Sequence, residues 1–129
     1  MNKAAFVIGP DVRIWGTIDT VQSIEVFGFV DGSISGAEVH VAQTAMVTGD
    51  IIATYVLVQG QVLGNIFADS LVLEETADVE GEIYHTELDL RVGANFEGRS
   101  RRHDKPKTLA ATMSVYERAD DDDHTIAPQ

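Results

Sequence analysis

Short stretches in which apolar and polar residues alternate fill most of the chain between residues 6 and 98. Within them the tripeptide Gly-x-Ile recurs five times, beginning at Gly16, Gly32, Gly49, Gly64 and Gly81. A sixth glycine, Gly98, follows on schedule but has no aliphatic residue after it. The spacing between successive glycines is nearly even along the whole series. A short, nearly fixed period indicates one structural unit stacked on copies of itself, which is a solenoid.

Aligning the repeats on the glycine places apolar residues in three columns. One lies two residues before the glycine, one lies two residues after it, and the third is an apolar-x-apolar pair. The members are Ile14, Val30, Val47, Val62, Val79 and Phe96; Ile18, Ile34, Ile51, Ile66 and Ile83; and Ile24/Val26, Val39/Val41, Val56/Val58, Leu71/Leu73 and Leu88/Leu90. A period of two predicts β-strands with these side chains on one side. We therefore expect an all-β parallel β-helix of about six short windings with a triangular section.

The two ends of this predicted solenoid carry the functional hypothesis. A terminal winding exposes unpaired backbone groups and apolar side chains, which solenoids normally hide under a capping element. Only five residues precede Phe6, and the chain passes from Gly98 directly into the basic stretch 99–103. We therefore expect an uncapped rod that associates end to end with copies of itself.

Charge divides the chain into regions. The formal net charge of the 129 residues is −12, and residues 6–98 hold fifteen acidic side chains against two basic ones. Residues 99–129 hold six of each sign. We expect a short leader (1–5), a β-helix polymerisation core (6–98) and a charged, disordered tail (99–129). An alternative for part of the tail is a short helix, with Leu109, Met113 and Tyr116 on one side, folded back over the last winding.

Several function classes are disfavoured by composition. An acidic body with so few basic residues argues against nucleic acid as a partner, because phosphate contacts supply most of that affinity. The four histidines share no metal-ligand spacing, and the three lysines (Lys3, Lys105 and Lys107) lie outside the repeats, so no phosphate-binding loop is expected there. We expect no catalytic residue, metal or cofactor. The absence of cysteine and of a long apolar run favours a cytoplasmic protein.

Three candidate contact surfaces follow from the columns. The C-terminal end of the core would present Phe96, Leu88, Leu90 and Val92, and the N-terminal end Phe6, Val7, Ile8, Val12 and Ile14. An outward column that turns apolar at Ile52, Phe67 and Tyr84, with Leu57 and Val72 nearby, would form a lateral or partner-binding surface. The alternative for the end residues is ordinary core packing, with Phe96 as a large plug.

The repeat region 12–98 closes in the segment Gly93-Ala94-Asn95-Phe96-Glu97-Gly98, which is followed by the basic residues 99–102. With this ending it resembles a bactofilin, a bacterial cytoskeletal protein with a right-handed β-helix core and disordered tails. The resemblance implies non-polar filaments that form without nucleotide through apolar contacts between core ends. It also implies a scaffold that localises cell-wall or cell-shape machinery. In that family an aromatic residue near the C-terminal end of the core is needed for filaments, and it maps onto Phe96. Many members carry an N-terminal membrane-targeting peptide, which adds the inner face of the cell membrane as a location.

Two other classes are alternatives. The left-handed β-helix of hexapeptide-repeat acyltransferases and related carbonic anhydrases forms trimeric enzymes, but its windings are longer and built from strict hexapeptide units. A monomeric solenoid that binds another molecule is the second alternative. The short and slightly uneven spacing of the repeat glycines favours the bactofilin resemblance over the enzymes, and the absence of regular outward threonine rows disfavours the binding module.

Overall fold

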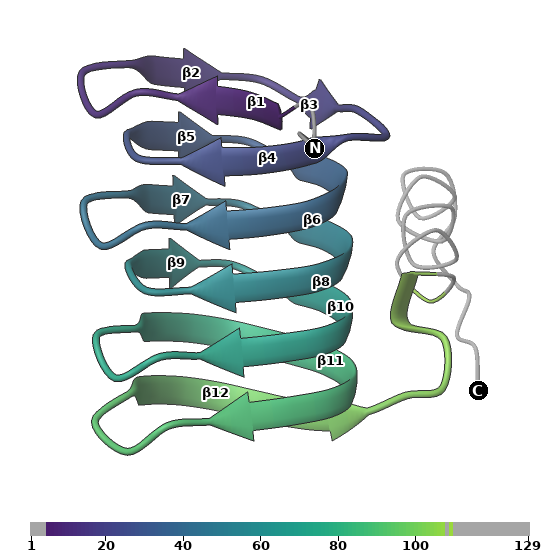
Figure 1. The fold of residues 1–129 in the computed structure, drawn as a ribbon. Helices are drawn as coiled ribbons and strands as arrows, with labels where there is room; N and C mark the ends of the chain where they lie inside the picture. Colours follow the sequence, from purple (N-terminus) through teal and green to yellow (C-terminus); the bar gives the residue numbers. More distant parts are fainter. Residues whose placement is uncertain (1–4, 108, 110–129) are drawn as a thin grey trace, which may run out of the picture.

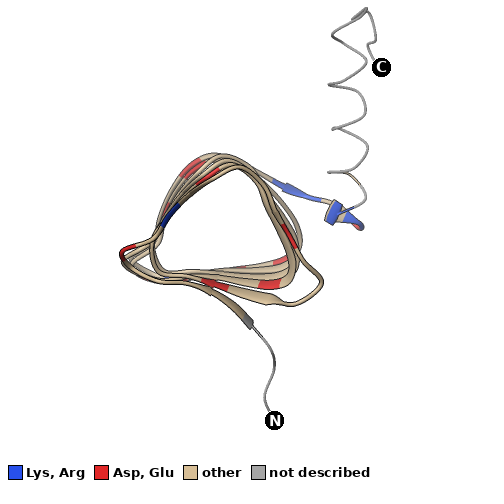
Figure 2. Ribbon diagram, turned by 90° about the horizontal axis from the view of Figure 1, so that it is seen from above, with Lys and Arg blue, Asp and Glu red and all other residues tan. Residues whose placement is uncertain are grey.

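In the computed structural model, which describes residues 5–107 and residue 109, the backbone winds about six times around one axis (Figure 1). Viewed from the N-terminal end, the chain turns clockwise as it moves away, so the β-helix is right-handed (Figure 1). Seen along the axis, the windings superpose as a triangle (Figure 2). The expected fold class is therefore confirmed, and the handedness separates the chain from the left-handed β-helix enzymes.

Each winding contributes one segment to each of three parallel sheets, which we call faces A, B and C. Face A contains β1 (Ala5–Ile8), β4 (Ser23–Val26), the second halves of β6 (Ile34–Val41), β8 (Ile51–Val58) and β10 (Ile66–Leu73), and the end of β11 (Asp78–Leu90). Face B contains β2 (Arg13–Trp15), β5 (Phe29–Asp31), β7 (Met46–Thr48), β9 (Gln61–Leu63) and the first residues of β11 and of β12 (Asn95–Arg102). Face C contains β3 (Ile18–Asp19), the first halves of β6, β8 and β10, the middle of β11 and the end of β12.

The apolar columns read from the sequence form the interior. On face C, for example, Ile34, Ile51, Ile66 and Ile83 are paired in register from one winding to the next, and all four are fully buried. On face B the same is true of Val30, Val47, Val62 and Val79. Stacking like residues at the strand spacing leaves little room for water, so the interior is a continuous aliphatic core.

The glycine of the Gly-x-Ile repeat stands at the corner between faces B and C. At Gly64 the backbone has a φ of 149°, a conformation that side chains disfavour. A Cβ atom placed there would lie 2.0 Å from the carbonyl oxygen of Gly49 in the winding before. Glycine is therefore required both by the turn and by the close approach of successive corners, which explains why the repeat is strict.

The corner between faces A and B explains the uneven period. It has four residues in one winding (42–45) and only two in the next (59–60). In the four-residue corner the amide of Ala45 donates to the carbonyl of Ala42 at 2.9 Å, closing a tight turn. The longer interval from Gly32 to Gly49 and the shorter one from Gly49 to Gly64 therefore reflect this one corner and leave the three faces aligned.

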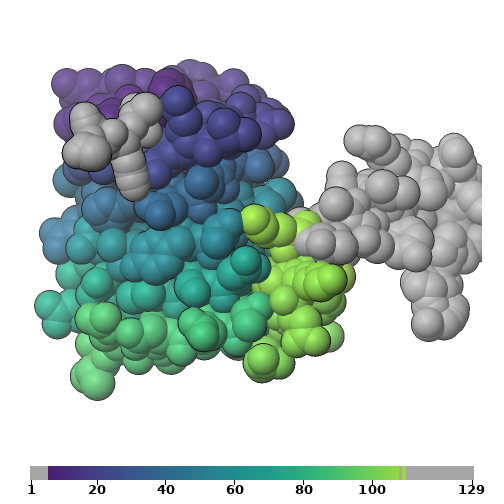
Figure 3. Space-filling model, turned by 45° about the vertical axis from the view of Figure 1, so that its right-hand side comes forward, coloured from purple at the N-terminus to yellow at the C-terminus, as the bar shows by residue number. Residues whose placement is uncertain are grey.

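The last strand extends further than the repeat pattern indicated. β12 continues past Gly98 to Arg102, so face C gains a sixth segment. Beyond it, residues 103–107 and Leu109 lie along the outside of face C (Figure 3). We call residues 103–107 and Leu109 the strap.

Candidate functional site

At the N-terminal end, inward-facing apolar side chains have no winding above them among the described residues. Phe6 is paired in register with the buried Ile24 and yet is 42% exposed. Ile14 and Ile18 begin the interior columns of faces B and C and are only partly buried against the core. All three faces therefore present apolar groups at this end.

The other residues predicted for the N-terminal surface are placed differently. Ile8 is fully buried in the core beside Val26. Val7 is paired with Glu25 on the outer side of face A, and Val12 lies at the adjoining corner; both are exposed. Trp15 is exposed on face B and makes an edge-to-face contact with Phe29 at a centroid distance of 6.4 Å.

At the C-terminal end, faces A and B are apolar. Phe96 continues the valine column of face B and packs, partly exposed, against the core, as does Leu88 on face A. Leu90 is 52% exposed and Val92, at the following corner, is 95% exposed. Phe96 therefore both closes the core and remains accessible at the end.

Face C ends in polar residues. Ser100 stands where the isoleucine column would continue, and Arg102 follows His85 in the next interior column. That column reads Gly36, Ala53, Ala68, His85 and Arg102. The sequence analysis missed it because glycine and alanine gave no apolar signal, although its members stand two residues after the repeat isoleucine.

His85 is a buried polar group at this end. Its Nε2 lies 2.8 Å from the hydroxyl of Ser100, and its buried Nδ1 has no partner among the described residues. Burial, with the nearby positive charge of Arg102 as a second cause, lowers the pKa of His85. The imidazole is therefore held neutral just inside the C-terminal end of the core.

The predicted lateral column lies on face C, beneath the strap. Ile52, Phe67 and Tyr84 are paired in register, and the Phe67 and Tyr84 rings stack at 4.8 Å. Leu109 packs on these residues, and the exposed fractions are only 3% for Phe67 and 7% for Tyr84. The column that the sequence left on the surface is thus covered by the chain itself, along the side of the rod.

Specific hydrogen bonds hold the strap. The amide of His103 donates to the carbonyl of His85 at 2.9 Å, and the Thr86 hydroxyl donates to the carbonyl of His103 at 2.9 Å. Further along, the ammonium of Lys107 donates to the Thr54 hydroxyl at 2.7 Å, and the amide of Leu109 donates to the carbonyl of Lys105 in a single helical turn. A fold-back through Leu109 was one of the expected alternatives; Met113 and Tyr116 lie outside the described residues.

Leu57 and Val72, the other two predicted lateral residues, are neighbours on face A and are half-buried. Carboxylates border this small patch, with Glu25 and Asp89 in the same outward column. It is separate from the column under the strap.

Basic and acidic side chains are segregated. Five of the nine Lys and Arg residues fall between Arg99 and Lys107, and they gather where the chain leaves the solenoid (Figure 2). Acidic residues lie on all three faces (Figure 2). Within residues 5–107 no group of three or more His, Asp or Glu could hold a metal ion, and no helix in that part is long and apolar enough to span a membrane.

The sequence matches a model of a known protein family. The family model Bactofilin, described as polymer-forming cytoskeletal, matches residues 6–101, from β1 almost to the end of β12. Comparisons with curated proteins and with solved structures gave no match.

Proposed function

The chain belongs to the bactofilin family of polymer-forming cytoskeletal proteins, and from this premise we propose that it is a scaffold built by end-to-end association of β-helices. The filament would be non-polar, with like ends in contact, and would form without nucleotide. Its role would be to localise cell-shape or cell-wall machinery in the cytoplasm or at the inner face of the membrane. The proposal gives the chain a structural role rather than a catalytic one.

The observation that supports the proposal most strongly is that both ends of the β-helix are uncovered. No described residue lies across either end of the triangle, while Phe6 at one end and Leu90 at the other leave about half of their surface exposed. Each end also carries strand edges whose backbone groups lack a neighbouring winding. A second copy placed on the end would cover both the apolar side chains and the edges.

Phe96 is proposed as the central contact of the C-terminal junction, with Leu88, Leu90 and Val92 around it. Phe6, Val12 and Ile14 are proposed for the N-terminal junction, with Val7 at its outer edge and Ile8 supporting it from the core. An aromatic side chain in the middle of an interface is a frequent hot spot, because it buries a large apolar area at low entropic cost.

Electron microscopy of the wild type beside Phe96→Arg tests the proposal. The wild type should form filaments without added nucleotide, and the variant should not. The variant should keep the circular dichroism spectrum of a β-helix, because an arginine at the end of the rod can extend into solvent. A wild type that stays monomeric at high concentration, or a discrete trimer, would contradict the scaffold role; an unfolded variant would assign Phe96 to the core alone.

A further inference from the structure

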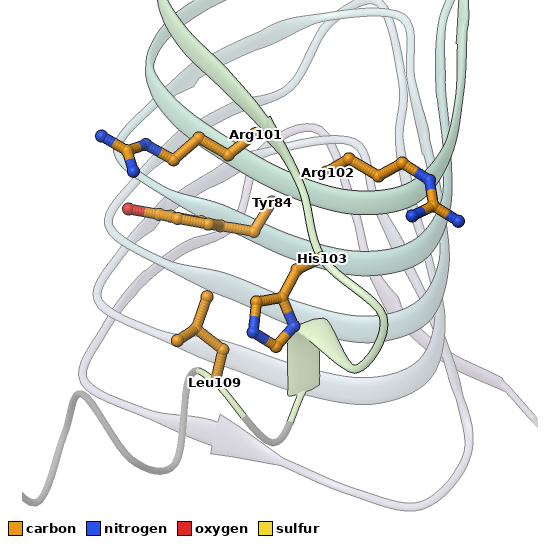
Figure 4. Close-up of a pocket in the computed structure, with 5 residues that line it drawn as sticks. All are labelled: Tyr84, Arg101, Arg102, His103 and Leu109. Carbon is orange, nitrogen blue, oxygen red and sulfur yellow. The ribbon is translucent and has the colours of Figure 1, made fainter.

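An open pocket of about 610 Å³ lies between the strap and face C, lined by Tyr84, Arg101, Arg102, His103 and Leu109 (Figure 4). The stacked ring of Tyr84 and the side chain of Leu109 supply apolar surface. Arg101 extends on the same side as the Tyr84 ring, whereas Arg102 projects to the other side of the strand (Figure 4). The pocket thus combines an apolar floor with cationic groups at its edge.

The cations of the pocket (Arg101 and Arg102) and the nearby Arg99 of the same strand are only partly neutralised. Arg102 pairs with Asp104 at 3.4 Å, and the hydroxyl of Tyr84 is hydrogen-bonded to Glu82. Within residues 5–107, neither Arg99 nor Arg101 forms an ion pair. The local excess of positive charge stands out on a body that otherwise carries thirteen more acidic than basic side chains between residues 6 and 98.

We propose that this pocket is a docking site for an acidic peptide segment and that its occupant is the run Asp120–Asp123 of the same chain. Four consecutive carboxylates form the densest negative charge in the sequence. Ten residues separate Leu109 from Asp120, and a linker of that length spans at most ~35 Å. The run is therefore within reach of Arg99, Arg101 and Arg102.

The covalent linker between Leu109 and Asp120 favours this occupant over others. A short linker holds a segment at an effective concentration on the order of millimolar, which an acidic face of another molecule does not match in dilute solution. An anionic membrane would meet the acidic faces together with the basic cluster, and these would repel it. The docked run would cover the positive side of the C-terminal end. The inference does not depend on filament formation, because binding takes place within one chain.

Zero-length cross-linking of the full chain tests the inference. A carbodiimide joins lysine amines to carboxylates, and among the residues that the structure describes the lysines are Lys105 and Lys107, both in the strap. Mass spectrometry should find both lysines linked to Asp120–Asp123, and in an equal mixture of isotopically light and heavy chains the linked peptides should come from one chain. The yield should fall about fivefold in the double variant Arg99→Gln, Arg101→Gln, as expected for the loss of two exposed ion-pair partners. Salt at about 1 M, where charges are screened beyond ~3 Å, should have the same effect.

Arg13→Gln is the control for position, since it removes one positive charge from the first winding, and its yield should equal that of the wild type. If neither the double variant nor salt lowers the yield of cross-links, the linker alone brings the lysines and carboxylates together. That result would overturn the inference. Links between light and heavy chains would make a second copy the occupant. Loss of the links on adding phosphatidylserine vesicles, but not phosphatidylcholine vesicles, would assign the basic cluster to a membrane.

Discussion

At its two ends the solenoid terminates the interior columns of faces A, B and C with different types of side chain. At the N-terminal end all three faces begin with an apolar side chain, namely Phe6, Ile14 and Ile18. At the C-terminal end faces A and B finish in Leu90 and Phe96, but face C finishes in Ser100 and Arg102. The C-terminal end also has the strap beside it, and no described segment is placed similarly at the N-terminal end.

This difference indicates that the two proposed junctions are not equivalent. A junction between N-terminal ends would depend on apolar burial alone and would be nearly insensitive to salt and pH. A junction between C-terminal ends would bring two basic clusters and two His85 side chains close together. Conditions that change charge should therefore act on one junction and leave the other intact.

The largest expected effect comes from blocking one end at a time. If like ends associate, Phe96→Arg should leave a dimer joined through N-terminal ends, and Phe6→Arg a dimer joined through C-terminal ends, each about twice the 14.0 kDa of the chain. Only the double variant should be a monomer, because a charge at an apolar junction costs several kcal/mol. Light scattering after size-exclusion chromatography measures these masses. Monomers from both single variants would instead show that unlike ends associate.

The second largest effect is expected from glycine substitutions, which should destabilise the first and the last winding to different extents. A Cβ at Gly98 would lie 1.7 Å from the carbonyl oxygen of Gly81, whereas a Cβ at Gly16 would meet nothing within 4 Å. Both glycines have positive φ. Gly16→Ala should therefore lower the free energy of unfolding by about 1–2 kcal/mol, the cost of the backbone conformation, and Gly98→Ala by about 3 kcal/mol or more, because the backbone must also move.

Urea unfolding of both glycine variants, made in the monomeric double-arginine background, measures this difference without interference from assembly. Equal losses would mean that the corners are set by the turn alone and that their stacking contributes little.

The fold could be predicted because each winding repeats the same physical requirement. Glycine is needed at every stacked corner, and the residues two positions before and after it must be aliphatic to fill the interior. A winding whose own pattern is irregular can therefore still be aligned by means of the other windings. The column of Gly36, Ala53 and Ala68 escaped notice because small residues fill the interior without a hydropathy signal, so the buried position of His85 was missed as well.

The sites could be predicted less completely, because they depend on features that occur once. Ile52, Phe67 and Tyr84 were recognised as an outward apolar column, and Leu109 as part of a segment that could fold back. The local pattern did not indicate that the two meet along the side of face C, since that contact depends on the path of the chain after Arg102. The end contacts remain predictions.

A smaller effect is expected at the strap. Leu109→Ala removes most of the apolar contact with Phe67 and Tyr84, which should weaken strap docking by about 1 kcal/mol. Hydrogen exchange at the amide of His103, which is bonded to the carbonyl of His85, should become about fivefold faster through more frequent local opening. Val21→Ala, in the first winding and almost fully exposed, should leave this amide unchanged. Unchanged exchange in Leu109→Ala would mean that the hydrogen bonds alone hold the strap.

The smallest effect concerns pH. Because the pKa of His85 is lowered in the folded protein, the unfolded chain binds a proton more readily than the folded one. The contribution of neutral His85 is therefore fully present above the ordinary histidine pKa of about 6.5 and is lost as pH falls below it. The urea midpoint should decrease between pH 7.5 and 5.5 more in the chain with His85 than in His85→Gln. Identical decreases would assign the pH dependence to other groups.

The column of repeat glycines at the corner between faces B and C has a consequence for the length of the molecule. Each interior winding carries its own corner glycine and its own aliphatic residues, so one winding could be duplicated or deleted without altering Phe6 or Phe96. The rod would then change length in steps of ~4.8 Å, the spacing between neighbouring strands, while its ends kept the same shape. The length of the subunit can thus change without any change in the residues that form the junctions. A bactofilin of this design could be shortened or extended by whole windings.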